Sequence, residues 1–289
     1  MGDERTGDSG GREFERVLDA LRTRLTDGTY QVGSRLPPQR ELAKHFDVSR
    51  DTVQRVLRAL VTEGWIESRQ GSGSRVIKAQ RIRTTTVPSA KPGHMRLGPM
   101  IGEAFSEPEV TLDVYTLTSQ SLDTHIRLQA ERIRVEEIAP RRIAVRMLLP
   151  SETLELPYPR AKDDPTDARP RERLRSIAHR STASLRDVLD SLRVENLVPE
   201  VSLDIRHAPL IPVFKLYLLN GTGALFGPYE VTERPIFLDK NEEIDAIDVV
   251  GIGASLTHYV KDDDPDSPGT FFVNSMQDWF NSVWNLLSA

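Results

Sequence analysis

The sequence predicts a multidomain chain: a small amino-terminal domain, mainly α with a β-hairpin, followed by an α/β domain with a central mixed sheet. The 289 residues suffice for two domains, and 38% hydrophobic residues can build a core in each. Apolar residues recur at helical spacing early in the chain, whereas strands alternate with helices later. The charge is also unequal, because residues 35–83 hold 11 Lys or Arg against 5 Asp or Glu, and residues 84–289 hold 22 against 31.

The composition excludes several classes of protein. Because there is no cysteine, neither a disulfide framework nor a thiolate metal site can form, which fits a reducing compartment. No apolar run approaches the length of a membrane span, and the start, MGDERTGDSGG, lacks the layout of a signal peptide. We therefore expect a cytoplasmic protein that begins with a disordered tail, residues 1–11.

Three helices are expected in the first domain, residues 12–78. The first ends at Asp27-Gly28, a common C-terminal signal. Its apolar face holds Phe14, Val17, Leu18, Leu21 and Leu25. The second helix begins at prolines 37 and 38 and is only about two turns long. Its buried side holds Leu42, Ala43 and Phe46.

A three-residue connection, 47–49, leads to the third helix, with Ser49 as its N-cap. The apolar face of this helix holds Val53, Val56, Leu57, Leu60 and Val61. Beyond it, two alternating runs, 65–69 and 74–78, flank the flexible residues QGSG and predict a β-hairpin. Arg69 and Arg75 flank its tip. The domain is thus predicted to be a winged helix-turn-helix, with this hairpin as the wing.

The outer face of the third helix predicts DNA binding. In a helix-turn-helix the second of the two short helices enters the major groove. Opposite the apolar stripe this helix carries Arg50, Gln54, Arg55 and Arg58. Arginine matches guanine or a phosphate, and glutamine pairs with adenine. A merely solvated face is the alternative, but helix lengths, turn, hairpin and charge together favour DNA contact.

Residues 12–78 resemble the winged-helix domain of the GntR family of bacterial transcription regulators. The segment VGSRLPPQRELAKHFDVSRDTVQRVLRALVTEGWIESRQGSGSRV follows the family's motifs in order: G-x-x-LP-x-x-R-x-LA, VSR-x-TV, L-x-x-x-G-hydrophobic, and a G-x-G wing. The resemblance implies that Arg40, Arg50 and Gln54 face the operator and that Arg35 contacts phosphate. Many family members carry arginine where this chain has Gln54, which implies a different operator sequence.

The resemblance also implies a homodimer on a palindromic operator, since family members bind two-fold sites as dimers. We expect the chain to act as a ligand-responsive repressor. The residues expected at DNA are Arg35, Arg40, Ser49, Arg50, Thr52, Gln54, Arg55, Arg58, Gln70, Gly71, Ser72 and Gly73.

Residues 79–96 are expected to form a linker, and residues 97–289 an α/β domain for effector sensing and dimerisation. The proline- and glycine-rich, semi-extended composition continues to residue 109. Strands are expected at 110–117, 142–150, 201–206, 212–220, 224–231 and 244–250, and helices at 120–137, 171–194 and 268–287. Alternating strands and helices favour a central, partly parallel sheet.

The loop after the first strand of this domain is a candidate effector site, since ligands of open α/β sheets bind at the carboxyl ends of strands. Within TLTSQSLDT, hydroxyls that suit an anion or a phosphorylated metabolite come from Thr116, Thr118, Ser119 and Ser121. Ordinary capping by these residues is the alternative. A second alternative is that the acidic domain docks another protein.

The segment VFKLYLLN resembles the phospholipase D signature H-x-K-x-x-x-x-D, with Lys215 and Asn220 at the lysine and aspartate positions. Val213 stands at the histidine position, so the nucleophile is missing. The resemblance implies a catalytically degenerate fold kept for sensing, with Lys215 and Asn220 at the effector site. Retained phosphodiesterase-like catalysis, or an ordinary strand lysine and turn asparagine, are the alternatives.

No other pattern predicts catalysis, a metal or a cofactor, because the six histidines are widely spaced and no phosphate loop occurs. We therefore predict a regulator that is not an enzyme. The last helix places apolar side chains on one stripe, either as domain core or as a dimer seam. They are Met276, Trp279, Phe280, Val283, Trp284 and Leu287.

Overall fold

The computed structural model describes residues 13–14, 16–18, 20–22, 24–25, 29–31, 33–62, 65–69, 73–76, 82–84, 97–238, 242–249, 251 and 256–288. The expected tail, the hairpin tip at 70–72 and most of the expected linker lie outside these residues. The chain divides into two compact units, one of residues 1–79 with 235–243 and one of residues 80–234 with 244–289.

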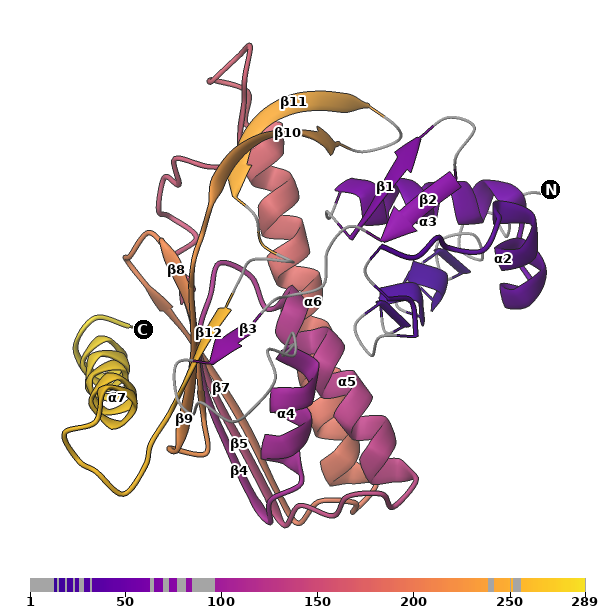
Figure 1. Ribbon diagram of the computed structural model, residues 1–289. Helices are drawn as coiled ribbons and strands as arrows, with labels where there is room; N and C mark the ends of the chain where they lie inside the picture. Colours follow the sequence, from indigo (N-terminus) through magenta and orange to yellow (C-terminus); the bar gives the residue numbers. More distant parts are fainter. Residues whose placement is uncertain are drawn as a thin grey trace, which may run out of the picture. The chain divides into compact units, whose positions relative to one another are not determined.

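The first unit combines helices with one short antiparallel strand pair (Figure 1). Helical residues between 13 and 25 precede α2 (Gln39–Phe46) and α3 (Arg50–Thr62). Strand β1 (Ile66–Arg69) pairs with β2 (Gly73–Val76). Every predicted apolar residue of α3 up to Leu60 is buried, and Val53, Val56 and Leu60 have no exposed surface. This packing fixes the direction of the opposite, polar face.

The second unit is built on a seven-stranded mixed sheet of order β3-β12-β9-β8-β4-β5-β7. Its strands are β3 (Ile82–Thr84), β4 (Glu109–Tyr115), β5 (Arg142–Pro150), β7 (Glu200–Ala208), β8 (Phe214–Leu219), β9 (Gly223–Pro228) and β12 (Leu256–Val260). β4, β5 and β7 run parallel to one another, while β8 is antiparallel to β4. The carboxyl ends of three parallel strands therefore meet at one edge of the sheet.

Helices cover both faces of this sheet (Figure 1). One face carries α4 (Leu97–Phe105), α5 (Gln120–Arg134) and α6 (Arg169–Val194), and the other carries α7 (Pro268–Leu286). A separate three-stranded sheet has the order β10-β11-β6. Its strands are β6 (Arg160–Ala161), β10 (Val231–Phe237) and β11 (Glu243–Val249). The α/β architecture with a central mixed sheet is as the sequence predicts.

Several elements differ from the sequence prediction. Helix α4 lies where a proline- and glycine-rich linker composition was expected to continue. Pro99 is tolerated because it lies in the first turn, where a backbone N–H has no intrahelical partner. Leu97, Ile101 and Phe105 then lie one turn apart and are fully buried. The expected linker also contains β3, which pairs parallel with β12.

The expected strand 224–231 is two strands, since β9 ends at Pro228 and β10 begins at Val231. Tyr229 lies between them, and its side chain is buried. The sequence prediction also missed β6, the body of β10, and β12. These strands are short or rich in charged residues, so their alternation is weak.

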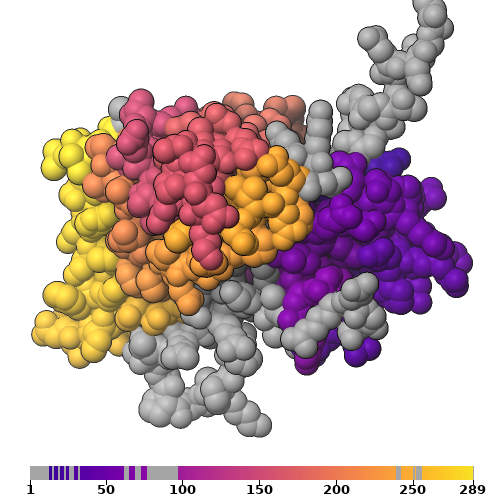
Figure 2. Space-filling view, turned by 90° about the horizontal axis from the view of Figure 1, so that it is seen from above, coloured from indigo at the N-terminus to yellow at the C-terminus, as the bar shows by residue number. Residues whose placement is uncertain are grey.

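The stripe on α7 is mostly domain core. Phe280, Val283 and Trp284 are at most 4% exposed, and Met276 and Trp279 pack against the same cluster. Leu287 is 51% exposed. Figure 2 shows α7, in yellow, at an outer surface of the second unit.

Candidate nucleic-acid interface

The turn between α2 and α3 has the geometry that the sequence predicts for a helix-turn-helix. Asp47 adopts a left-handed conformation with φ of 52°, and the Val48 amide donates to the Ala43 carbonyl at 3.0 Å. The Ser49 hydroxyl accepts a hydrogen bond from the Thr52 backbone amide at 3.0 Å. Ser49 is therefore the N-cap of α3, as predicted.

The exposed side of α3 presents Arg50 and Gln54 directly to solvent. Both lie in the amino-terminal part of the helix, where helix-turn-helix proteins contact base edges. The side chain of neither residue has a hydrogen bond or ion pair within the described part of the chain. Their polar groups are thus available for an external partner.

The remaining α3 residues of the predicted set have other environments. Thr52 is only 5% exposed, and its hydroxyl lies 2.9 Å from that of Ser49. The side chain of Thr52 is thus buried beside the cap of α3, and its predicted contact with DNA stays a prediction. The Arg55 guanidinium lies 5.0 Å from the Phe14 ring centroid, a cation–π contact within the unit. Arg58 is half-buried and has its own interaction within the chain.

Arg40 is exposed on α2, one residue after the helix begins. Arg35 is exposed too, and its backbone forms a bridge with Arg75 of β2. The amide of Leu36 donates to the Ser74 carbonyl at 2.9 Å, and Arg75 Nε donates to the Gly33 carbonyl at 2.9 Å. This segment thereby extends the β1–β2 pair. Sequence reasoning missed the extension because it joins residues about 40 positions apart.

The expected wing contacts fall largely outside the described residues. Gln70, Gly71 and Ser72 are among those not described, so their roles at DNA stay predictions. Gly73 begins β2 with φ of 76°, a conformation that L side chains rarely adopt. A glycine is thus required there by the backbone.

The candidate effector loop of the second unit uses its hydroxyls internally. Thr116 is 3% exposed and bonds to the Thr118 carbonyl at 2.9 Å and to the Tyr229 hydroxyl at 3.0 Å. Ser119 has no exposed surface and lies 3.3 Å from the Thr182 hydroxyl of α6. Ser121 is half-buried near the start of α5. The hydroxyls of Thr116 and Ser119 are therefore used internally, whereas Thr118 and Ser121 are half-buried, and a ligand at this loop stays a prediction.

Lys215 and Asn220 are not brought together. Five residues along β8 separate them by about 16 Å. Lys215 is 2% exposed, with its ammonium 5.3 Å from the Tyr229 ring centroid, and burial lowers its pKa to about 7. Asn220 lies in a turn with φ of 49°, where its amide group bonds to the backbone of Thr111 and Ala104. The place of these two residues at an effector site stays a prediction.

A pocket of about 400 Å³ lies close to the predicted loop, at the carboxyl ends of β4, β5 and β7. Leu117, which follows β4, lines it, as do Ser151 after β5 and His207 near the end of β7. The position agrees with the sequence prediction, but the lining residues differ. Half of them come from α6, where an arginine repeat at four-residue spacing was the only sequence signal.

Within the described residues, no helix is long and apolar enough to cross a membrane. No group of three or more His, Cys, Asp or Glu side chains is placed to hold a metal ion in the same part of the chain.

Comparison with known proteins identifies the amino-terminal segment. Residues 14–76 match the model of the gntR family of bacterial regulatory proteins. An uncharacterized HTH-type transcriptional regulator YdfD of Bacillus subtilis (strain 168) is 35% identical over 65 residues, 22% of this chain and 14% of the relative. The Exu regulon transcriptional regulator of Escherichia coli (strain K12) is 36% identical over 69 residues, 24% of this chain and 27% of the relative.

Among solved structures, Streptococcus agalactiae GntR is 38% identical, covering 22% of this chain and 31% of that chain, with a TM-score of 0.21. This chain thus covers less than a third of the length of each of these three proteins. The family model matches the segment that holds α2, α3, β1 and β2. Residues 14–76 are a helix-turn-helix domain of the gntR family.

Proposed function

We propose that the chain is a GntR-type transcription repressor that binds a palindromic operator as a homodimer under control of a ligand of its second unit. The observation that supports this most directly is the outer face of α3. There Arg50 and Gln54 are exposed and unpaired within the described residues, directly after a helix cap that fixes their direction. In our proposal, these two side chains read bases.

Contacts to phosphate complete the interface. Arg35 and Arg40 are exposed on the segment that precedes α3, and both carry positive charge. Such contacts position a protein on the duplex and make its affinity depend on salt. We propose this role for both residues.

The homodimer follows from the limited size of one recognition helix. A single module of this type buries too little surface for high specificity, whereas two copies on a two-fold site double the number of base contacts. A ligand of the second unit would then act by binding more tightly to one arrangement of the two helix-turn-helix domains of the dimer. It can shift DNA binding only by that difference in affinity.

We propose that the second unit is not an enzyme. Val213 provides no nucleophile, and the amide group of Asn220 is already bonded to two backbone segments. The burial of Lys215 also separates its amine from solvent. Incubation with bis(4-nitrophenyl) phosphate tests this directly: we expect no release of nitrophenol above a heat-treated control, and sustained release would refute it.

Selection of binding sites from random duplexes tests the central proposal. We expect enrichment of a two-fold symmetric sequence, and light scattering should show a dimer on one duplex. Placing that sequence upstream of a reporter should give lower expression when the protein is present. Enrichment of no sequence would contradict DNA reading, enrichment of one asymmetric half-site would contradict the palindrome, and increased expression would contradict repression.

A further inference from the structure

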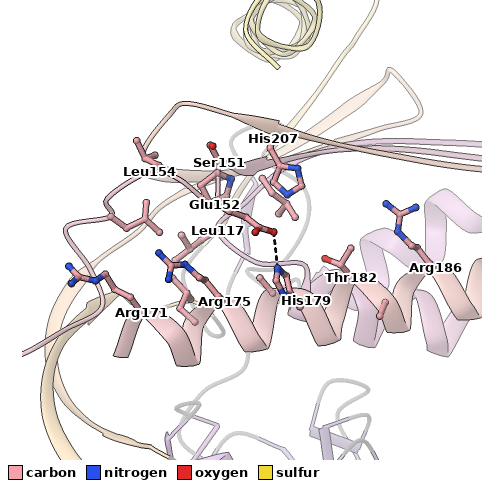
Figure 3. Close-up of a pocket in the computed structure, with 16 residues that line it drawn as sticks. Leu117, Ser151, Glu152, Leu154, Arg171, Arg175, His179, Thr182, Arg186 and His207 are labelled. Carbon is pink, nitrogen blue, oxygen red and sulfur yellow. Dashed lines mark hydrogen bonds and ion pairs between the residues drawn. The ribbon is translucent and has the colours of Figure 1, made fainter. Parts of the chain in front are cut away.

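The pocket of the second unit lies between α6 and the loop that follows β5 (Figure 3). It has a volume of about 400 Å³, within the range of pockets that bind small molecules. Three parallel strands end at its edge, which is the position where open α/β sheets bind ligands. Neither the sequence resemblance nor the matched relatives assign anything to it.

The floor of the pocket is apolar. Leu117, Leu156 and Leu174 line it and also pack against the buried rings of Tyr158 and Tyr229. Leu149, Leu154 and Ala178 extend the same surface. A ligand that covers this floor gains free energy from removing hydrocarbon from water. The occupant must therefore have an apolar body.

The rim of the pocket is cationic. Arg171, Arg175 and Arg186 project from one face of α6, and Figure 3 shows them along the same helix. In the described part of the chain, the side chain of none of the three has a hydrogen bond or an ion pair within 4 Å. Guanidinium groups that remain unpaired beside an apolar surface are suited to bind a planar anionic group.

One carboxylate reduces this positive charge. Glu152 lies in the loop after β5 and accepts a hydrogen bond from His179 Nε2 of α6 at 2.8 Å, so the pair spans the pocket (Figure 3). The hydrogen bond to His179, together with the charges of His207 and Arg175, lowers the pKa of Glu152. Three arginines against one carboxylate leave the rim positive. An anion that enters beside Arg175 is repelled by Glu152 and attracted by the arginines.

From this arrangement we infer that the pocket binds an amphipathic organic anion. Its apolar body lies on the leucine floor, and its anionic head lies at Arg175, beside the Glu152–His179 pair. The inference deepens the proposed function, since it rests on that proposal for the role of the ligand as effector. The pocket itself binds the anion whether or not the chain binds DNA.

Isothermal titration calorimetry of the full chain tests the inference with four probes. Decanoate and decyl phosphate combine an apolar body with a carboxylate or a phosphate head, and the inference is met by tight binding of either one. Decanol has the body without charge, and inorganic phosphate has the charge without the body. We expect at least one amphipathic anion to bind at least about tenfold more tightly than both partial probes. Equal binding of decanol, equal binding of inorganic phosphate, or no binding of either amphipathic anion would each overturn the inference.

Two variants locate the head group. Arg175→Gln should weaken binding of the better anion at least about tenfold, because a charged hydrogen bond is lost. Glu152→Gln should tighten it, since a like charge is removed. Arg180→Gln is the matched control: it removes one arginine from the same helix, outside the pocket lining, and should leave affinity unchanged.

Ala178→Trp should fill the pocket and abolish binding, with circular dichroism confirming that the variant is folded. Unchanged affinity in Arg175→Gln and folded Ala178→Trp would place the ligand elsewhere and overturn the inference. DNA binding is measured separately without ligand. A chain that binds operator but no anion contradicts only this inference, whereas a chain that binds anion but no DNA contradicts the proposed function.

Discussion

Helices α3 and α6 both carry arginines on one face and apolar residues on the other, but their surroundings differ. Along α3, the apolar face is covered from Val53 to Leu60. In α6, the fully covered apolar residues lie in the carboxy-terminal half, from Leu185 to Leu192, while the amino-terminal half borders the pocket. Arg50 of α3 therefore faces solvent, whereas Arg171, Arg175 and Arg186 of α6 line a pocket. Periodicity alone does not distinguish the two cases.

The comparison is first tested by removing core side chains. Leu60→Ala in α3 and Leu185→Ala in α6 each create a cavity at a fully buried site and should cost about 2–5 kcal/mol of stability. Because the chain divides into two compact units, hydrogen exchange should increase mainly in the unit that carries the substitution. Increased exchange throughout both units in either variant would contradict separate cores.

The second prediction concerns Lys215, whose burial sets the second unit apart in its response to pH. Its pKa is about 7 in the folded chain against 10.5 in the unfolded reference. Between these values the unfolded chain binds a proton that the folded chain lacks, so stability rises with pH. Below pH 7 both states bind the proton, and the cost of burying the charge is present in full.

Lys215→Met should therefore be more stable than the parent at pH 7. Its free energy of unfolding should also lack the rise with pH, of up to about 1.4 kcal/mol per pH unit, that Lys215 causes in the parent. Urea denaturation between pH 7 and pH 9 measures this slope. The pH window ends below the ordinary pKa of tyrosine. Burial raises the pKa of Tyr115 to about 12, so this tyrosine stays protonated throughout the window. An identical pH dependence in both proteins would show that the amine of Lys215 is charged and solvated.

The third prediction uses one serine from each helix. Ser49→Ala removes the cap of α3 and should cost about 1 kcal/mol of stability in the first unit. Ser181→Ala removes only a bond to the Ile177 carbonyl one turn earlier in α6, where alanine favours the helix, so a change within about 0.5 kcal/mol is expected. Denaturant titrations monitored by hydrogen exchange measure the stability of each unit separately. Equal losses would mean that Ser49 is not acting as a cap.

The first unit was largely predictable because its signals are local. The apolar spacing of α3, the short connection before it and the capping serine all lie within 15 consecutive residues. The inward orientation of Thr52 was not predictable, since it depends on the hydroxyl bond to Ser49. The bridge between Arg35 and Arg75 joins distant segments and leaves no local pattern.

The pocket of the second unit lies near the loop where the sequence predicts a ligand, but its lining residues were not predicted. The rule for open sheets places a ligand beside the loop after β4, and Leu117 of that loop does line the pocket. The hydroxyls of Thr116 and Ser119 instead satisfy buried neighbours, Tyr229 and Thr182. Which polar groups are consumed internally is decided by packing between distant segments. Sequence periodicity contains no information about it.

Binding isotherms on the selected operator at several salt concentrations test the central claim most directly. Arg50→Ala should cost about 1–3 kcal/mol at the operator and relax discrimination at one base pair. Arg35→Ala should weaken binding to all DNA sequences alike. It should also lower the slope of log affinity against log salt concentration by about one. Arg186→Ala, an exposed arginine of α6, should change neither quantity in the absence of ligand. Full operator affinity in Arg50→Ala would contradict the account, because α3 would then not be the segment that reads DNA.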